Sequence, residues 1–262
     1  MFGCRQRLLA VLAALAVATS AHAQDRIIPT VAAAADLKFA LEEVAARYRA
    51  ETAQEVRLIF GSSGSFAAQL RQGAPFQIFL SADEGFVFQL ADAGLTIDRG
   101  RLYAEGRIVL FAPNGSSLKP DAKFDGLRAA LKDGRIRRFA MANPEHAPYG
   151  RAAEQALTSQ GLWEAIKPRI VLGENVSQAA QFAASGSADG GIIAYSLALA
   201  PTFAGRGSYA LIPGEFHAPL RQRMVLLHHA GEAARAFYDY LRTPSARTIL
   251  RKYGFATPHE AF

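Results

Sequence analysis

Cysteine is nearly absent from the sequence, because Cys4 is the only one among the 262 residues. It precedes an apolar run at residues 8–18, whereas the cysteine of a lipoprotein would follow such a run, so the sequence predicts no lipid anchor. A single cysteine forms neither an intrachain disulfide nor a cysteine metal site. The hydrophobic core must therefore hold the chain together, as one large domain or as two of about half its size.

Long apolar runs are also missing. The run at residues 8–18 is too short to cross a bilayer, which needs ~20 residues. Residues 1–7 before it carry two arginines and no acidic residue, and after it Ala21 and Ala23 are small residues of the kind that a signal peptidase recognises. This three-part pattern predicts a secretory signal peptide over residues 1–23, cleaved after Ala23, and therefore a periplasmic protein.

Clusters of basic residues are absent as well. Without the two arginines of the signal peptide the chain has 27 basic and 23 acidic residues, a net charge of +4, and these charges are interspersed. A surface that tracks a phosphate backbone needs a basic patch or stripe, so the sequence predicts no nucleic-acid partner. The sequence also contains no P-loop and no dinucleotide fingerprint. The mild positive balance is compatible with an anionic ligand.

In the mature chain, short β-branched runs alternate with helical stretches, which is typical of an α/β protein with mostly parallel sheets. Strands are expected at residues 27–33, 55–60, 76–81, 107–112, 138–142, 169–172, 190–194 and 223–228. Helices are expected at residues 37–50, 65–72, 84–93, 150–160, 177–185, 232–242 and 244–252.

These elements form two βα units of similar size. The chain passes from the first unit to the second near residue 107 and returns through residues 213–223. We therefore expect two lobes, the first formed by residues 24–106 plus 222–262 and the second by residues 107–221. Ligands of open α/β sheets lie beyond the carboxyl ends of the strands, so the pattern predicts a ligand cleft between the lobes.

Small residues end a strand and open a helix at three places, residues 32–37, 60–65 and 143–151. The start of a helix leaves backbone N–H groups without intrahelical partners and carries about half a positive charge. Several such ends aimed at one point bind an anion without any lysine or arginine. Each loop taken alone is typical of ordinary helix capping, so the prediction of an anion site depends on their combination.

The sequence resembles the periplasmic molybdate-binding proteins, a branch of the type II periplasmic solute-binding protein family, over nearly the whole mature chain. The segments that carry the resemblance are VAAAADL at residues 31–37, GSSGS at 61–65, GAP at 73–75, FLSAD at 79–83, NPEHAPYG at 143–150, ENV at 174–176, FYDYL at 237–241 and YGF at 253–255. The resemblance implies a two-lobed protein that captures molybdate or tungstate for an ABC importer and contacts its membrane permease subunits. It also implies a monomer that is not an enzyme and uses no cofactor.

The ligand contacts are implied by the same resemblance. In the family, hydroxyls and backbone N–H groups hold the oxyanion without salt bridges, and no metal cation is expected in the site. Ser63 matches a serine that donates both its hydroxyl and its N–H, and Ser62 matches an additional serine that some members use. Tyr149 and Val176 match positions of the second lobe whose backbone N–H groups reach the anion.

The first ligand loop, at Ala35 and Asp36, departs from the family, because its best-defined members have a hydroxyl or amide residue at position 36. An ionised carboxylate 4 Å from a unit of anionic charge repels it by ~4 kcal/mol at an effective dielectric of about 20. The carboxylate could turn away to cap its own helix, it could be protonated against the anion, or the ligand could differ. We favour capping, because Asp is a preferred N-cap residue.

A second departure is Ala194, which occupies a position where one branch of the family places a tyrosine hydroxyl. The next residue, Tyr195, would point elsewhere if the strand continued, because side chains alternate along a strand. Tyr149 is the candidate for a substitute hydroxyl. This combination resembles the branch of the family with an expanded coordination shell.

Three other functions remain open. A binding protein for sulfate, another oxyanion or a metal cation would account for Asp36 in the first ligand loop. An exported hydrolase would use residues 61–65 as its nucleophile elbow, but Ser65 stands where that motif has glycine, and no histidine stands out as a partner. His146 is expected to shape its loop rather than to contact a ligand. A sensory or assembly protein with the same fold would bind a membrane partner but no transporter.

Overall fold

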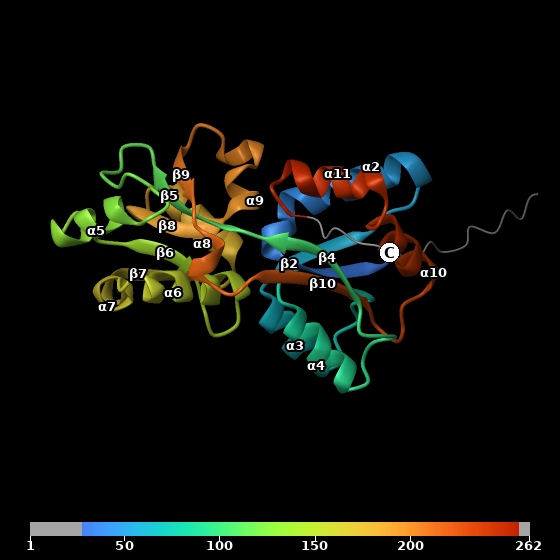
Figure 1. Ribbon diagram of the computed structural model, residues 1–262. Coiled ribbons are helices and arrows are strands. Elements are labelled where there is room, and N and C mark those ends of the chain that lie inside the picture. The colour runs from blue at the N-terminus through green and yellow to red at the C-terminus, as the bar shows by residue number, and fades with distance from the viewer. Residues whose placement is uncertain (1–27, 257–262) are drawn as a thin grey trace, which may run out of the picture.

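The computed structural model describes residues 28–256, which form two lobes side by side, each built on a five-stranded sheet (Figure 1). We call the lobe that contains β1 the first lobe and the other the second lobe. The predicted signal peptide, its cleavage site and Cys4 lie outside the described residues. Within the described part of the chain, no helix combines the length and the apolar character required to cross a bilayer.

The sheet of the first lobe has the strand order β2-β1-β3-β10-β4. Its strands are β1 (Thr30–Ala34), β2 (Arg57–Gly61), β3 (Ile78–Ser81), β4 (Arg101–Gly106) and β10 (Leu220–Leu226). The β1 strand runs parallel to β2 and β3, whereas β10 is antiparallel to β3 and β4. Both β1 and β3 are almost entirely buried, as expected for parallel strands covered on two faces.

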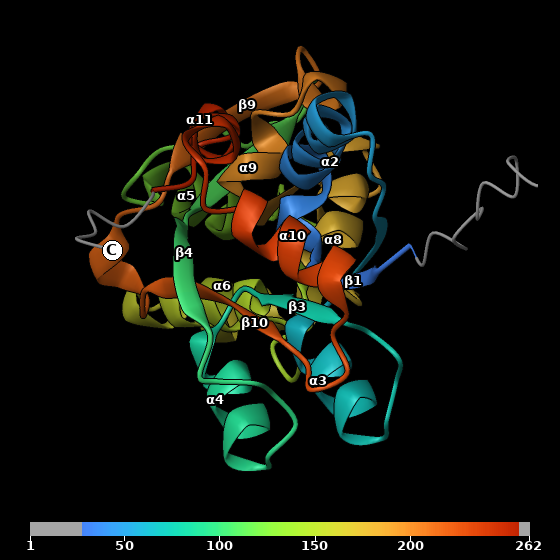
Figure 2. The ribbon, with the colours of Figure 1, turned by 90° about the vertical axis from the view of Figure 1, so that its right-hand side faces the viewer.

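Helices cover both faces of this sheet (Figure 2). They are η1 (Ala35–Leu37), α2 (Lys38–Thr52), α3 (Ser63–Arg71), α4 (Glu84–Asp92), α10 (Glu232–Tyr240) and α11 (Pro244–Lys252). Alternate residues of β1 face the two cores: Val31 and Ala33 pack in the core with α2, α10 and α11, whereas Ala32 packs in the core with α3 and α4. Because β1 is covered on both sides, its carboxyl end is held firmly at the junction of the lobes.

The sheet of the second lobe has the order β7-β6-β8-β5-β9. Its strands are β5 (Ile108–Pro113), β6 (Phe139–Ala142), β7 (Ile170–Gly173), β8 (Gly190–Ala194) and β9 (Gly207–Leu211). Its helices are α5 (Asp125–Lys132), α6 (Pro148–Ser159), α7 (Trp163–Ile166), η2 (Lys167–Arg169), α8 (Val176–Ala184), α9 (Tyr195–Ala198), η3 (Pro201–Phe203) and η4 (Gly214–Phe216). The core of this lobe continues into Ala34, Ala35 and Ala82 of the first lobe, so the two lobes are packed against each other.

The chain crosses between the lobes twice. Arg107 alone separates the end of β4 from the start of β5, and residues 212–219 lead from β9 back to β10. Each of β5 and β10 runs antiparallel to both of its neighbours. The predicted α/β fold class is confirmed, but the expectation of mostly parallel sheets is wrong, because these two strands make half of the pairings in each sheet antiparallel.

The elements β4, α5 and β9 are not among those predicted from the sequence. In β4, exposed Arg101 and Glu105 stand on either side of buried Tyr103 and Ala104, and β9 lies at the edge of its sheet with largely exposed side chains. Edge strands of this kind lack the run of apolar residues that identifies a buried strand. The α5 helix follows Phe124, whose backbone is left-handed with φ 62°, instead of a Ser, Thr, Asp or Asn cap.

The stability of the first lobe depends on the aromatic core beneath α10. Phe237 is fully buried and meets Tyr48 edge to face, with ring centroids 5.1 Å apart. We expect Phe237→Ala to lower the free energy of unfolding by about 3–5 kcal/mol, because the cavity adds to the lost burial. Arg235→Ala on the exposed side of the same helix should change it by less than about 0.5 kcal/mol. Urea unfolding measures both, and equal losses in the two variants would contradict this account of the core.

Candidate functional site

A small cavity lies where the carboxyl ends of β1, β2 and β3 meet the start of α6 and α8. Its volume is about 10 Å³, so in this closed arrangement it accommodates only a small ligand. All six residues predicted to bind the ligand line it: Ala35, Asp36, Ser62, Ser63, Tyr149 and Val176. Their contact with a ligand remains a prediction, but the fold brings them together from both lobes.

The first lobe contributes the N-terminus of α3. Ser62 is the N-cap of this helix, and its Oγ accepts the N–H of Ser65 at 3.2 Å. Ser63 is fully buried, and its Oγ accepts the N–H of Ala82 at 2.9 Å. Since a hydroxyl is both donor and acceptor, this contact fixes the oxygen and leaves its proton to be donated to a ligand.

The second lobe contributes two further helix N-termini. In α6, Pro148 occupies the first turn and Ala147 provides no side-chain cap, so the N–H of Tyr149 belongs to an uncapped first turn. In α8, Oδ1 of Asn175 accepts the N–H groups of Ser177 and Gln178 at 3.0 and 3.1 Å. The cap therefore occupies the second and third N–H groups and leaves that of Val176 beside the cavity.

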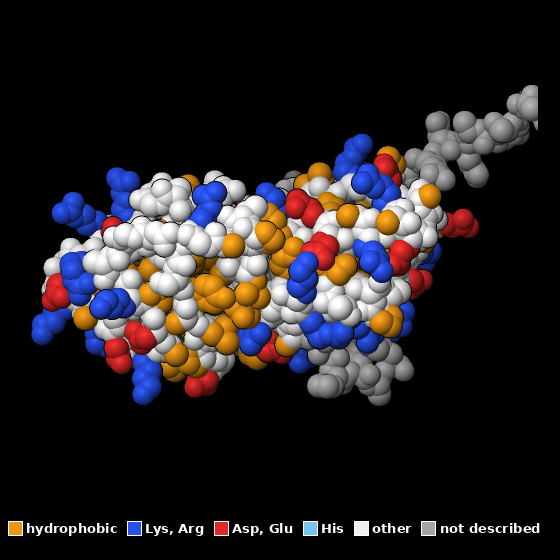
Figure 3. Space-filling view, turned by 90° about the horizontal axis from the view of Figure 1, so that it is seen from above, with side chains coloured by type: hydrophobic (Ala, Val, Ile, Leu, Met, Phe, Trp, Pro, Cys, Tyr) orange, Lys and Arg blue, Asp and Glu red, His pale blue; other side chains and the backbone are white. Residues whose placement is uncertain are grey.

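No cation takes part in this lining, because Lys, Arg and His are all absent from the residues around the cavity. On the face shown in Figure 3, Lys and Arg side chains are scattered over both lobes with Asp and Glu between them, and they are not gathered at the junction. Attraction for an anion must therefore come from helix N-termini and a serine hydroxyl.

Asp36 is the one carboxylate in the lining, and only 1% of it is exposed. Its Oδ2 accepts hydrogen bonds from Nε2 of Gln222 at 2.6 Å and from the hydroxyl of Tyr149 at 2.9 Å. Its Oδ1 has no hydrogen-bond partner among residues 28–256. Burial raises the pKa of Asp36 to about 6, although the hydrogen bonds from Gln222 and Tyr149 lower it in part.

Two interpretations made from the sequence are corrected here. The expected helix cap is not formed, because Asp36 lies inside η1 and two side-chain donors take its carboxylate instead. The hydroxyl of Tyr149 is also not a substitute ligand group. It donates to Asp36 and accepts from Gln222 at 3.1 Å, so its single proton is already used.

A buried polar network extends from Asp36 to β10 and β4, the two strands of the first lobe that lie beside the crossings. Gln222 on β10 donates to Asp36, and its Oε1 accepts the hydroxyl of Tyr103 on β4 at 2.8 Å. Burial, followed by the charge of Asp36, raises the pKa of both Tyr103 and Tyr149 well above the usual value, so both keep their protons. A side chain at Gly106 would put its Cβ 2.1 Å from the hydroxyl of Tyr149, so the network requires glycine there.

Gln222 is not among the site residues predicted from the sequence, although a signal for it exists. In β10 the residues Leu220, Gln222 and Met224 alternate with Arg221 and Arg223. Side chains two apart share a face of a strand, so Gln222 falls on the same face as the apolar residues and is buried. A polar residue at a core position needs hydrogen-bond partners, which marks it as part of a network.

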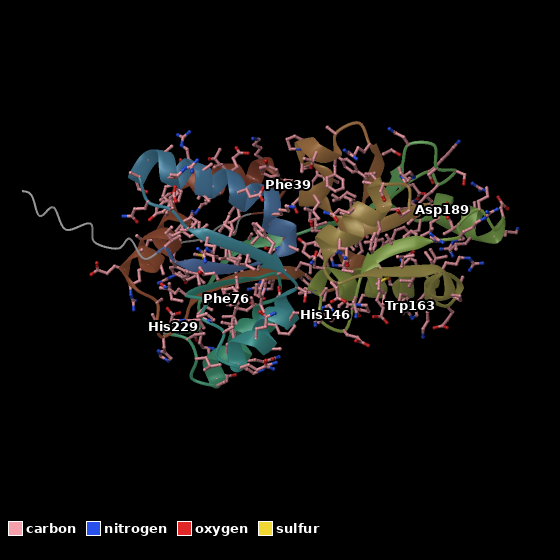
Figure 4. The ribbon with its side chains drawn as sticks, turned by 180° about the vertical axis from the view of Figure 1, so that it is seen from behind. Phe39, Phe76, His146, Trp163, Asp189 and His229 are labelled. Atoms are coloured by element: carbon pink, nitrogen blue, oxygen red, sulfur yellow. The ribbon has the colours of Figure 1, made fainter. Side chains whose placement is uncertain are left out.

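His146 joins the lobes at the rim of the cavity, where Figure 4 shows it at their junction. Its backbone oxygen accepts the N–H of Gly64 at 2.9 Å, and its Nδ1 lies 2.9 Å from Oγ of Ser62. Its Nε2 lies 3.5 Å from the carboxylate of Glu174. The sequence indicates no histidine partner for the serine loop, whereas the structure places His146 there, because the loop before α6 folds over the start of α3.

Two more contacts cross the same interface. Arg151 of α6 forms an ion pair with Asp83, and the hydroxyl of Ser196 donates to the backbone oxygen of Asp36 at 2.8 Å. Within residues 28–256, no three His, Cys, Asp or Glu side chains form a group that could hold a metal ion.

Comparison with known proteins identifies relatives over the whole described chain. The profile of the family described as "Bacterial extracellular solute-binding protein" matches residues 29–256. The chain is 36% identical to the molybdate-binding protein ModA of Rhodobacter capsulatus over 229 residues, which is 86% of this chain and 87% of that protein. It is also 36% identical to the molybdate-binding protein ModA of Azotobacter vinelandii over 252 residues, which is 95% of this chain and 96% of that protein. The solved structure of the periplasmic molybdate-binding protein of A. vinelandii superposes with a TM-score of 0.79 at 31% identity, covering 88% of this chain and all of that one.

The close approach of the lobes at Gly64 leads to a prediction. A Cβ at this position would lie 2.5 Å from the backbone oxygen of His146, so Gly64→Ala should prevent full closure while leaving α3 intact. In an anion titration followed by small-angle X-ray scattering, we expect this variant not to reach the compact form that the unchanged protein adopts.

Gly231→Ala is the matched control, because Gly231 precedes α10 outside both crossings and a Cβ there would meet only Oε1 of Gln77, at an ordinary contact distance of 3.9 Å. It should close as the unchanged protein does. Equal compaction of both variants would contradict the assignment of Gly64 to the closing interface.

Proposed function

Because the chain belongs to the family of bacterial extracellular solute-binding proteins, we propose that it captures a tetrahedral oxyanion, molybdate or tungstate, for an ABC importer. The observation that carries the proposal is the cavity between the lobes, where the first N–H groups of α6 and α8 and the hydroxyl of Ser63 converge without a Lys, Arg or His in the described lining. The relatives named molybdate-binding proteins support molybdate as the ligand.

The proposed ligand contacts are the hydroxyl and N–H of Ser63, the N–H groups of Tyr149 and Val176, and the first loop at Ala35 and Asp36. Hydrogen bonds from neutral donors to an ion contribute about 1.5–3 kcal/mol each. A site of this kind binds tightly when both lobes contribute and releases the ion when they separate. Molybdate and sulfate carry equal charge, so selection between them would come from the size of the closed cavity and the number of donors.

The importer is the proposed partner. Closing two lobes on one ion is a hinge motion, and the hinge here would be Arg107 and residues 212–219, the two crossings. The closed form presents one continuous surface across both lobes, which permease subunits in the membrane would distinguish from the open form. We further propose that residues 1–23 direct export to the periplasm and that the protein acts as a monomer without a cofactor.

Isothermal titration of the signal-free protein, residues 24–262, with molybdate, tungstate and sulfate tests this function. We expect tight binding of one ion of molybdate or tungstate per chain and weak or no binding of sulfate. Absence of heat with all three ions would overturn the oxyanion assignment. A metal cation would then be the next ligand to titrate, with Asp36 as its carboxylate.

The same titration tests the role of Ser63. We expect Ser63→Ala to weaken molybdate binding about 10- to 150-fold, because a hydrogen bond to a charged ligand is lost. Ser185→Ala, an exposed serine at the end of α8, serves as the control and should bind as the unchanged protein does. Circular dichroism confirms that both variants are folded, and unchanged affinity in folded Ser63→Ala would refute the first-lobe contact.

One observation favours a second candidate, an exported hydrolase. Ser62, His146 and Glu174 lie in the order of a nucleophile, a base and an orienting acid, at 2.9 and 3.5 Å. Against this function, Oγ of Ser62 also caps α3, and the glutamate side chain is 77% exposed. Turnover of p-nitrophenyl esters that disappears in both Ser62→Ala and His146→Ala would establish it, and absence of turnover in the unchanged protein would exclude it for that substrate class.

A further inference from the structure

The carboxyl group of Asp36 uses only one of its two oxygens within the protein. Oδ2 accepts two hydrogen bonds, from Gln222 and from Tyr149. Oδ1 is buried and accepts none from the described residues, although Asp36 lines the cavity. A buried polar atom without a partner is rare in folded proteins and points to a group that the protein itself does not supply.

Among residues 28–256, no positively charged side chain contacts Asp36 to balance an ionised carboxylate. From α6 it faces the hydroxyl of Tyr149, from β10 the amide of Gln222, from β4 the more distant hydroxyl of Tyr103, and from α9 Ser196, which bonds only its backbone oxygen. Both tyrosines keep their protons, because burial and the charge of Asp36 raise their pKa.

Around the cavity itself, the other groups are two serine hydroxyls, an asparagine that caps α8 and backbone N–H groups. His146 precedes Ala147, which lines the cavity, but is not itself part of the lining, and its Nδ1 contacts Oγ of Ser62. None of the described groups that face Asp36 would therefore stabilise an ionised carboxylate directly beside a dianion.

Two donors on Oδ2 decide where a proton on this carboxyl would lie. Oδ2 has both lone pairs occupied, so the proton belongs on Oδ1. A protonated Oδ1 is a donor, and an oxyanion in the cavity is an acceptor. Because the pKa of Asp36 is raised to about 6, protonating this carboxyl near neutral pH costs little free energy. A dianion beside the carboxyl favours the protonated form further.

On the basis of the proposed function, we propose that Asp36 is protonated in the occupied site and donates a hydrogen bond from Oδ1 to the bound oxyanion, so that each dianion is captured together with one proton. The proton comes from solvent, no covalent bond forms, and the complex has one positive charge more than the separate ionised protein and dianion. Asp36 is then a ligand residue that acts as a hydroxyl does, and it makes capture sensitive to pH.

The sign of the pH dependence follows from the two states of Asp36. In the ligand-free protein the carboxyl loses its proton as the pH rises through about 6, whereas in the complex it keeps the proton to higher pH. Affinity is therefore constant below that pH and falls about tenfold per pH unit above it. Between pH 6.5 and 8.5 the dissociation constant for molybdate should rise on the order of 100-fold.

Calorimetry measures the proton directly. Molybdate is titrated into the signal-free protein at pH 8 in several buffers that differ in ionisation enthalpy, and the slope of observed enthalpy against ionisation enthalpy gives the protons taken up. We expect about one proton per ion, because pH 8 lies about two units above the pKa of the free carboxyl. Infrared difference spectra on binding should show a protonated carboxylic acid.

Asp36→Asn is the decisive variant. Its amide oxygen accepts from Gln222 and Tyr149, and its NH₂ group takes the place of the protonated Oδ1. We expect binding without proton uptake, with affinity independent of pH and higher than that of the unchanged protein at pH 8.5. The new infrared band should be absent.

Asp83→Asn is the matched control. It removes a carboxylate that also lies at the interface of the lobes, paired with Arg151, but outside the cavity lining. It should keep both the proton uptake and the pH dependence.

Tight binding of molybdate to the unchanged protein without proton uptake, or with the same affinity from pH 6.5 to 8.5, would overturn the inference and leave the proposed function intact. Loss of all binding in folded Asp36→Asn would also overturn it, because the amide supplies the donor that the inference requires. Absence of oxyanion binding to every variant at every pH would overturn the proposed function itself, and this inference with it.

Discussion

Helix N-termini from two lobes point at one small cavity, and the rest of the structure serves to hold them there. The N–H groups at Ser63, Tyr149 and Val176 lie at the ends of α3, α6 and α8, and no lysine or arginine replaces them. Each of these helices packs buried residues against its lobe, so its direction is fixed by burial. In the proposed function, fixed dipoles would then stabilise the anion, and the two lobes would bring them together and separate them.

Polar contacts across the junction make the closed arrangement specific. Gly64 bonds to His146, Asp83 pairs with Arg151, and Asp36 accepts the hydroxyl of Tyr149. The last contact links the first ligand loop to the second lobe, and through Gln222 it reaches β10, one of the strands beside a crossing of the chain. The lining of the cavity and the contact between the lobes are therefore connected through the same carboxyl group.

The sequence predicted the two-lobed α/β architecture and the loops that line the cavity, partly from local patterns and partly through its resemblance to a family. Buried parallel strands such as β1 and β3 are apolar along their length, and small residues mark the turns into α3 and α6. The side chain of Asp36 could not be placed from the sequence, because its partners Tyr149 and Gln222 are 113 and 186 residues away. The direction of β5 and β10 was missed for the same reason, since only the return of the chain between lobes determines it.

Diffraction from crystals grown with tungstate, recorded at an absorption edge of tungsten, tests most directly whether both lobes hold one oxyanion. The account predicts a single anomalous peak in the cavity, with oxygens within hydrogen-bond distance of Ser63 on one side and of the N–H groups of Tyr149 and Val176 on the other. It also predicts Oδ1 of Asp36 within hydrogen-bond distance of one of these oxygens. A peak elsewhere on the protein, or an ion bound by one lobe alone, would contradict it.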